Sequence, residues 1–309
     1  MESDMTVKVR VPASSANLGP GFDCMGVALN LYTEISLSII NDGLIIEVSG
    51  EGHKEIEKDE ENLVYKAVSK IFQKAQVPLK GLKIQIKNGI PLKSGLGSSA
   101  AAIIGGMMGA NELLGGFFTK DEILNIAAVM EGHADNVGPA LNGGLNITAV
   151  DGDYAYYVKK ELDNNLHFIA FTPQKGLKTE IARNILPEKI DFKDGVFNTG
   201  RASLLTAAFL TQNYELLKVA SLDRLHQQYR SALIPEMYQC FDKAMSAGAY
   251  SAFLSGAGPT IMALSCIDKD DEIINEVGNV YVSKNIPYRV YKLYCENKGT
   301  QILKTPLIK

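Results

Sequence analysis

Cysteine is scarce in this chain of 309 residues, which contains only four. They are far apart in the sequence and form neither a CxxC pair nor a Cys/His cluster with the spacing of a zinc site. Scattered thiols of this kind are typical of proteins in a reducing compartment, where disulfides are rare. We therefore expect free, buried thiols at Cys24, Cys240, Cys266 and Cys295.

Long hydrophobic runs and blocks of like charge are missing as well. The least polar stretch, Ala100–Ala110, is too short and too rich in glycine to span a bilayer. The segment MESDMTVKVR has acidic residues where a signal peptide needs basic ones. The formal net charge of −4 argues against a general nucleic-acid surface, and the densest charge run, Glu55–Glu61, is expected to be a solvated loop. These features predict a cytoplasmic protein with no nucleic-acid or membrane partner.

The common nucleotide-binding signatures are absent or incomplete. The chain has no Walker G-x-x-x-x-G-K-[ST] pattern and no V-A-I-K strand of the protein kinases. The sequence Gly95-x-Gly97-x-x-Ala100 matches the dinucleotide fingerprint. However, residues 88–94 separate it from the expected strand at residues 82–87, and this spacer disfavours a Rossmann turn.

The most informative stretch that is present is PLKSGLGSSAAA, residues Pro91–Ala102. Gly95 and Gly97 lack a Cβ atom, so the backbone can turn sharply and bring its amides close to a ligand. Ser98 and Ser99 then open a run of small residues that predicts a buried helix. The amino end of a helix attracts anions, which favours a polyphosphate ligand. A glycine-rich turn before a helix is also compatible with a purely structural connection.

The hydrophobic pattern predicts a mixture of strands and helices without strict βαβ alternation, which favours an α+β fold. A turn at Asn41–Gly43 is expected to join two strands in a hairpin, and residues 13–23 are expected to form a loop. The helix at residues 198–212 is expected to be buried, because it has apolar residues on nearly every face. The chain length suggests two lobes that meet near residue 155.

Three separated motifs resemble, in order, the three motifs of the GHMP kinases. They lie at Pro12–Asp23, Pro91–Ala101 and Ser255–Thr260. The first motif is similar to that of the homoserine kinases in particular, as are Glu131–Val137 and Arg230–Pro235, so the resemblance covers residues 6–295. It implies a two-lobed fold with a ribosomal-S5-like lobe at residues 1–155 and a ferredoxin-like lobe at residues 156–309, with the active site between them. It also implies a homodimer.

The resemblance further implies that the protein uses ATP and Mg²⁺ to phosphorylate the side-chain hydroxyl of L-homoserine, a step of threonine biosynthesis. An amino-acid substrate needs a carboxylate for its ammonium group and a guanidinium for its carboxylate. The residues implied to contact homoserine are Asn17, Asp23, His133, Asp135, Thr179, Arg183 and Arg230. Phosphoryl transfer depends mainly on positioning and charge neutralisation, so direct transfer without an obligatory strong base is expected, with Asp135 assigned first to substrate binding.

Catalytic roles are implied for Ser99, Glu131, Asp135 and Asn136, of which Ser99 and Glu131 are the expected Mg²⁺ ligands. The residues implied to bind ATP are Asn62, Pro91, Leu92, Lys93, Ser94, Gly95, Leu96, Gly97, Ser98, Ser99, Ala100, Ala101, Gly256 and Gly258.

Two alternatives stay open on the sequence. One is another GHMP kinase that acts on an anionic diphosphate precursor, although Asp23 and Asp135 would repel such a substrate. The other is a catalytically silent member that binds a metabolite as a sensor. The presence of Ser99, Glu131 and the glycine-rich loop favours catalysis.

Overall fold

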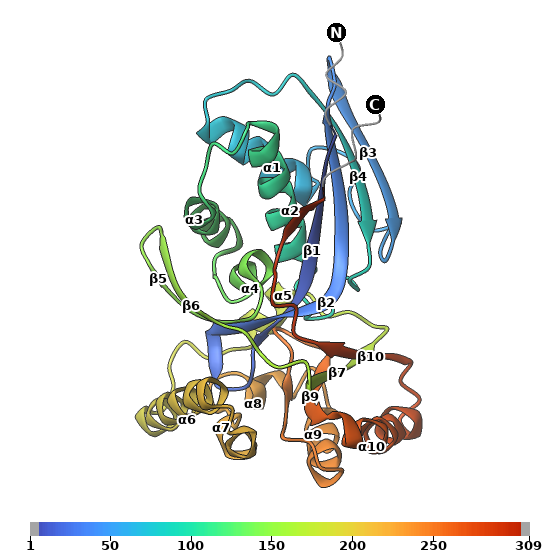
Figure 1. Ribbon diagram of the computed structural model, residues 1–309. Helices are drawn as coiled ribbons and strands as arrows, with labels where there is room; N and C mark the ends of the chain where they lie inside the picture. Colours follow the sequence, from blue (N-terminus) through green and yellow to red (C-terminus); the bar gives the residue numbers. More distant parts are fainter. Residues whose placement is uncertain (1–5, 304–309) are drawn as a thin grey trace.

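The computed structural model describes residues 6–303, whose strands form two sheets in two lobes (Figure 1). The seven-stranded sheet has the order β11-β1-β2-β4-β3, and β5 and β6 extend it from β2; the four-stranded sheet has the order β10-β7-β9-β8. The α+β class predicted from the sequence is thus confirmed. The strands are β1 (Thr6–Asn17), β2 (Gly21–Ile39), β3 (Gly43–Gly50), β4 (Gly81–Asn88), β5 (Leu145–Asp151), β6 (Tyr154–Lys160), β7 (Leu166–Pro173), β8 (Ser251–Leu254), β9 (Ile261–Cys266), β10 (Tyr288–Tyr294) and β11 (Gln301–Leu303).

Helices cover one face of each sheet (Figure 1). The helix α2 packs directly on β1 and β2, with α1 and α3 beside it, and α9 and α10 pack on the smaller sheet. The α-helices are α1 (Leu63–Lys74), α2 (Ser98–Leu113), α3 (Lys120–Glu131), α4 (Val137–Asn142), α5 (Thr179–Asn184), α6 (Phe192–Thr211), α7 (Leu217–Ala220), α8 (Gln227–Arg230), α9 (Met237–Ser246) and α10 (Asp270–Ser283).

The small residues of α2 explain how closely this helix approaches the sheet. A Cβ atom at Gly105 would lie 2.5 Å from Cδ1 of Ile35, and one at Gly109 would lie 2.6 Å from Cδ1 of Leu37. Neither space holds a methyl group unless these side-chain ends move, so glycine lets the helix lie close to the sheet without that shift. The close packing fixes α2 on β1 and β2, and therefore fixes where its amino end points.

The hairpin predicted at Asn41–Gly43 is wrong. The chain does turn there, but β2 and β3 do not pair, because β4 lies between them, antiparallel to β2 and parallel to β3. Turn residues report only the local reversal of the chain. The choice of partner strand depends on which apolar faces are buried, and here Ile84 of β4 is buried opposite Leu37 of β2.

The loop predicted at residues 13–23 is also mostly wrong. Residues Ala13–Asn17 continue β1 and pair with β2, with register shifts after Pro12 and Ala16. This stretch shows no polar and apolar alternation because both of its faces are buried. The resulting strand end lies where the two lobes meet, since the N–H of Gly256 donates a hydrogen bond to the carbonyl oxygen of Ala16 at 3.0 Å.

The expectation of a buried helix near residues 198–212 is wrong for most of α6. Only Asn198, Leu205, Ala208 and Phe209 are buried, and Phe192 at its amino end is 86% exposed. Only one stripe of the helix packs against the rest of the lobe, and the apolar side chains of Phe192, Val196 and Leu210 are exposed.

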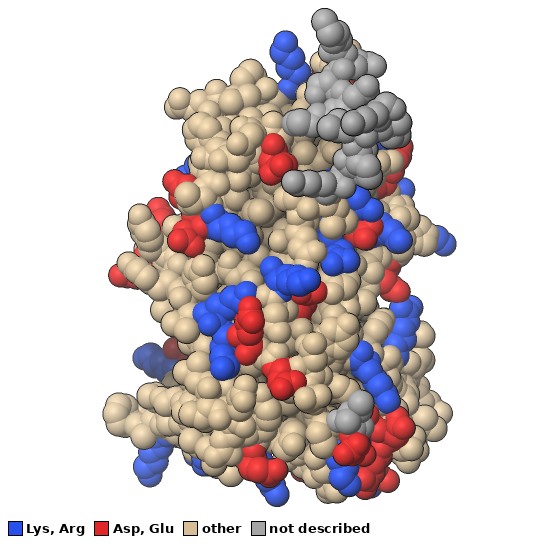
Figure 2. Space-filling model, in the orientation of Figure 1, with Lys and Arg blue, Asp and Glu red and all other residues tan. Residues whose placement is uncertain are grey.

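Sheet membership places the change of lobe later than residue 155, which lies inside β6 of the larger sheet. The chain passes to the smaller sheet between β6 and β7, and it returns when β11 pairs with β1. All four cysteines are free thiols, but only Cys240 and Cys295 are buried as expected, whereas Cys24 and Cys266 are half-buried. Within residues 6–303 there is no helix with the length and apolar character needed to cross a membrane. Basic and acidic side chains are interspersed among the described residues on the face in Figure 2.

Candidate active site

Two adjoining cavities lie at the amino end of α2 and share Lys93, Ser98 and Ser99 in their walls. The first has a volume of about 240 Å³. Its apolar lining is formed by Ile56, Leu63, Val64, Ile86, Leu92 and Ala102. The second has a volume of about 170 Å³. Its polar and charged lining includes Asn17, Asp23, Glu131, His133, Asp135, Asn136, Thr179, Arg183 and Arg230. An apolar chamber thus opens beside a charged one, with one helix end between them.

The glycine-rich loop that leads into α2 is locked between the two lobes. The hydroxyl of Ser255 donates a hydrogen bond to the carbonyl oxygen of Gly95 at 2.7 Å, and the N–H of Ser14 donates to the carbonyl oxygen of Leu96 at 3.2 Å. A Cβ atom at Gly95 would lie 2.2 Å from the carbonyl oxygen of Ser255, and one at Gly97 would lie 2.0 Å from Oγ of Ser14. All three sequence motifs therefore meet at this loop.

The amino end of α2 is open toward the cavities. Gly97 is its N-cap residue, with φ at +70°, and no side chain within residues 6–303 caps the first N–H groups. Uncapped N–H groups at a helix terminus carry a partial positive charge and bind phosphate well. The hydroxyl groups of Ser98 and Ser99 lie in the shared wall beside them.

A bidentate ion pair between Asp23 and Arg183 occupies the second cavity. The Arg183 guanidinium donates hydrogen bonds to the two carboxylate oxygens of Asp23 at 2.8 and 3.0 Å. Asp23 has φ at +57°, and its N–H donates to Oδ1 of Asn17 at 3.0 Å. Thr179 and Arg183 lie one turn apart on α5, and both line this cavity, as their spacing suggests.

Acidic groups also cluster around His133 on the other side of the cavity. Its Nδ1 forms a short hydrogen bond with the carboxylate of the buried Asp135. Burial alone would lower the pKa of His133, but this hydrogen bond and the negative charges of Asp135, Glu131 and Asp23 outweigh it and raise the pKa. The amide of Asn136 lies beside them and accepts a hydrogen bond from the hydroxyl of Ser14 at 2.9 Å.

Glu131 and Ser99 offer a pair of oxygen ligands suited to Mg²⁺. The hydroxyl of Ser99 donates to Oε2 of Glu131 at 2.9 Å. Burial raises the pKa of Glu131, which reflects a carboxylate without enough compensating positive charge around it. A hard cation shared between this carboxylate, the hydroxyl and a bound phosphate would supply that charge, so the residues fit Mg²⁺.

Another group with metal-binding geometry, Asp23, His133 and Asp135, has ligand atoms within 4.8 Å of one another. We favour Glu131 and Ser99, because Asp23 is already neutralised by Arg183 and a cation there would face a guanidinium.

Arg230 lines the second cavity, although its side chain is almost entirely buried. Its Nε donates to the carbonyl oxygen of Ala182 at 3.0 Å, and its Nη1 donates to the carbonyl oxygen of Gly256 at 3.0 Å. Burial, with the nearby Arg183, lowers the pKa of Arg230 to about 10, so the guanidinium is still charged at neutral pH.

Most of the residues assigned from the sequence therefore come together, but some line neither cavity. Leu96, Ala100 and Ala101 are buried. A Cβ atom at Gly258 would lie within 3 Å of Ile234 and Leu254, which gives this glycine a packing role. The other predicted ATP residue outside the cavity walls is Pro91. Asn62 lines the first cavity, but its Oδ1 is already the cap of α1, accepting from Val64 N at 2.9 Å and Tyr65 N at 3.3 Å.

Part of the first cavity consists of residues that the sequence motifs do not predict. Glu55 and Glu57 belong to its wall, although their charge run is expected to be solvated, and Asn88 lies there at the end of β4. Lys93 reaches across to Glu55 with an ion pair of 2.9 Å. The Asn88-Gly89 pair that ends the alternating pattern of β4 is the signal that could have indicated Asn88.

Comparisons with known proteins show which family the chain belongs to. The model of the GHMP kinases N terminal domain matches residues 62–144, and that of the GHMP kinases C terminal matches residues 205–283. The chain is 58% identical to a homoserine kinase of Caldanaerobacter subterraneus subsp. tengcongensis, over 99% of each chain. It is 44% identical to one from Clostridium botulinum, over 96% of this chain and 99% of the relative.

Solved structures of kinases share the fold of this chain. A homoserine kinase from Cytophaga hutchinsonii superposes with a TM-score of 0.87 at 29% identity, covering 98% of this chain and 99% of that one. A mevalonate kinase from L. major has a TM-score of 0.74 at 18% identity, covering 97% and 98%, and shares the fold. An uncapped helix end between an apolar and a charged cavity, on this two-lobed fold, is the arrangement of a small-molecule kinase of the GHMP type. Within that class, the chain belongs to the homoserine kinase family.

Proposed function

We propose that this protein transfers the γ-phosphoryl group of ATP to the side-chain hydroxyl of L-homoserine, forming O-phospho-L-homoserine in threonine biosynthesis. The observation that carries the proposal is the open amino end of α2 in the wall shared by the two cavities. A phosphate chain held there has its nucleoside on the apolar side and its terminal phosphate on the charged side.

The first cavity suits the nucleoside of ATP. Its apolar side chains bury a base, and the backbone of Gly95–Ser99 turns its N–H groups to the phosphates. Lys93 lies in the shared wall and adds a positive charge near the phosphates. Phosphoryl transfer requires mainly that the two reacting groups be held in line and that negative charge be neutralised.

The second cavity suits a small zwitterion with a free hydroxyl. Asp23 and Asp135 offer carboxylates to an ammonium group, while Arg183 and Arg230 offer guanidinium groups to a carboxylate. In the free protein Asp23 and Arg183 form an ion pair with each other. When the zwitterion binds, its ammonium group takes the place of Arg183 beside Asp23, and its carboxylate takes the place of Asp23 beside Arg183. The side-chain hydroxyl then points toward Ser99 and the phosphate site.

Glu131 and Ser99 are the residues that would hold Mg²⁺. When bound, the ion neutralises negative charge on the phosphates. Asp135 is already engaged by His133, so we assign it to holding the substrate rather than to removing the hydroxyl proton. Asn136 lies beside Asp135 and helps to orient the hydroxyl. Transfer is then direct, with no obligatory strong base.

The scattered free thiols support a cytoplasmic location, and we also propose a homodimer. The exposed apolar side chains of α6, such as Phe192 and Val196, offer a surface for such contacts. Light scattering of the purified protein tests the dimer directly.

The central experiment is an ADP-release assay with L-homoserine, using L-serine and mevalonate as controls. We expect ADP release with L-homoserine, and phosphorus NMR of the product should show a phosphate ester on the side-chain oxygen. Release only with mevalonate would favour another GHMP kinase. Calorimetric binding of L-homoserine without ADP release would instead favour a sensor.

A further inference from the structure

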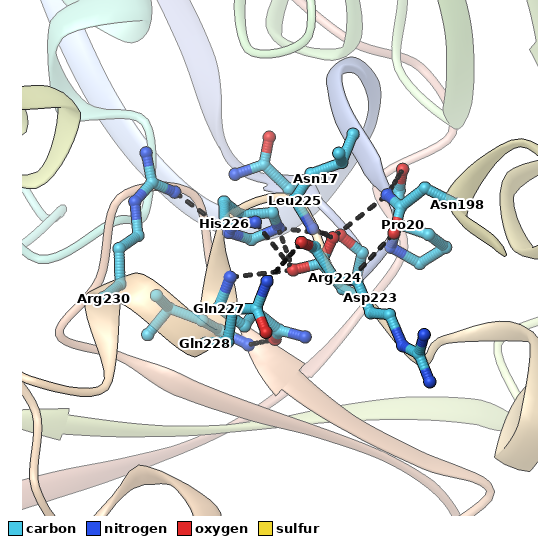
Figure 3. Close-up of polar contacts among 12 residues, drawn as sticks. Asn17, Pro20, Asn198, Asp223, Arg224, Leu225, His226, Gln227, Gln228 and Arg230 are labelled. Carbon is cyan, nitrogen blue, oxygen red and sulfur yellow. Dashed lines mark hydrogen bonds and ion pairs between the residues drawn. The ribbon is translucent and has the colours of Figure 1, made fainter. Parts of the chain in front are cut away.

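Arg230 is held by a histidine that lies outside both cavities. Its Nη1 lies 3.2 Å from Nδ1 of His226, a side chain that is completely buried (Figure 3). With Ala182 and Gly256, this ring supplies the acceptors for Nε and Nη1. Within residues 6–303 the structure gives Nη2 no acceptor, and Arg230 borders the second cavity. The fixed contacts thus hold the guanidinium and leave its remaining donors free.

The hydrogen bonds define the protonation of the His226 ring. A guanidinium only donates, so Nδ1 must be the unprotonated acceptor. The proton is then on Nε2, which donates to the carbonyl oxygen of Gly19 at 2.8 Å. Burial lowers the pKa of His226 and the Arg230 charge lowers it further, against the opposing effect of Asp223. A second proton on the ring would also point directly at Arg230.

The main chain of His226 is fixed as firmly as its ring. The carboxylate of Asp223 accepts hydrogen bonds from the N–H groups of Leu225, His226 and Gln227 at 2.9, 3.0 and 2.7 Å (Figure 3). It also accepts one from the side-chain amide of Asn198 at 3.1 Å. This carboxylate therefore sets the start of α8, and with it the direction of the imidazole.

The ring also touches the segment that carries Asp23. Gly19 belongs to the turn between β1 and β2, and a Cβ atom there would lie 2.2 Å from the carbonyl oxygen of Ser221. The ring of Phe22 lies 5.2 Å from that of His226, and its face lies 5.3 Å from the guanidinium carbon of Arg230 and 5.7 Å from that of Arg183. His226 therefore connects the turn beside Asp23 to Arg230.

From this geometry we infer that His226 is a positioning residue for substrate binding: its Nδ1 orients Arg230 toward the carboxylate of the amino-acid substrate, and its Nε2–H ties that arginine to the Gly19 turn. The inference rests on the proposed function for the identity of the substrate. It assigns to His226 an effect on homoserine binding rather than on the transfer step, because the ring contacts neither cavity.

Two substitutions separate the two ring nitrogens. In His226→Asn the amide oxygen takes the place of Nδ1 and still accepts from Arg230, whereas the bond to Gly19 is lost. In His226→Gln the amide nitrogen takes the place of Nε2 and still donates to Gly19, whereas the acceptor for Arg230 is lost. His167→Gln is a control for the loss of a hydrogen-bonded histidine away from the site, because His167 is part-buried and bonds Asp270 at 2.7 Å on the smaller sheet.

Steady-state kinetics and thermal melting of the four proteins test the inference. We expect His226→Gln to raise the KM for homoserine about tenfold, equivalent to about 1.4 kcal/mol, with kcat and the KM for ATP within about threefold of wild type. His226→Asn should keep the homoserine KM within about threefold. His167→Gln should alter the melting temperature alone. Equal increases of the homoserine KM in His226→Asn and His226→Gln would overturn the inference. So would a homoserine KM that rises in proportion to the loss of melting temperature in all three variants, His167→Gln included.

Nitrogen-15 NMR of the imidazoles gives a second readout that does not depend on activity. The resonances of His226 should show the neutral Nε2–H tautomer from about pH 6 to 8. An Nδ1–H tautomer or an imidazolium in that range would refute the assignment. Wild-type ADP release with homoserine reports on the proposed function itself, so its failure is seen separately from that of the His226 inference.

Discussion

Replacing Asp23 by asparagine isolates the charge that the proposed site uses for the substrate ammonium group. Asparagine has nearly the same shape and tolerates a positive φ, so the backbone at +57° is kept. Loss of a hydrogen bond to a charged group costs about 1.5–3 kcal/mol, which corresponds to a rise of roughly 10- to 150-fold in the KM for homoserine. The KM for ATP should stay within about twofold, because Asp23 lines only the second cavity.

The same substitution should have only a small effect on stability. The side chains of Arg183 and Asp23 are 37% and 34% exposed, so solvent screens their ion pair, which is then worth about 1 kcal/mol or less. For a chain of this length such a change lowers the melting temperature by no more than about 2–4 °C.

A double-mutant cycle with Arg183→Gln completes the test. The two side chains bond each other in the free protein, so their effects on stability should be coupled. Steady-state kinetics with homoserine and ATP varied separately would measure the binding effect. A homoserine KM that stays within twofold of wild type in Asp23→Asn, or an equal rise in both KM values, would refute the reasoning.

Three further predictions concern the acidic cluster. Asp135→Asn should mainly raise the KM for homoserine, by about tenfold, and homoserine titrations that instead show a collapse of kcat at constant KM would identify Asp135 as a base. Glu131→Gln should reduce kcat/KM by about 10²-fold or more yet raise the melting temperature at pH 7. The reason is that burial raises the pKa of Glu131, so the stability that its protonated carboxyl group contributes below pH 4.5 is lost as pH rises through that pKa. A lower melting temperature of Glu131→Gln at pH 7 would contradict this prediction. Wild type should be more stable than His133→Gln below pH 6.5, and that advantage should disappear as pH rises through the raised pKa of His133; melting curves that keep a constant difference up to about pH 9 would count against it.

The parts of the site that could be predicted were those concentrated in short motifs. The loop before α2 and the segment Ser255–Thr260 have unusual backbone conformations or close contacts that favour glycine, and the glycines are visible in the sequence. The structure shows why the motifs share one place: Ser255 bonds the carbonyl oxygen of Gly95, and the end of β1 bonds Leu96.

What could not be predicted depends on residues that are distant in the chain. The insertion of β4 beside β2 follows from burial of one apolar face of the sheet, where Ile84 lies opposite Leu37, whereas the turn at Gly43 indicates only a reversal. Glu55 and Glu57 are predicted to be solvated because their segment is rich in charged residues, yet they border a cavity. His226 is one polar residue among many in its segment, and its bond to Gly19 appears only in three dimensions.

The pairing of β11 with β1 gives the second lobe the topology of an insertion. The chain leaves the larger sheet after β6 and rejoins it through a bridge between Leu29 and Cys295 and then through β11, so two separate backbone crossings join the lobes. A pair of crossings resists twisting of one lobe about the other more strongly than a single tether does. Substrate access at the junction is therefore expected to come from rearrangement of loops and side chains, with the two sheets keeping their mutual orientation.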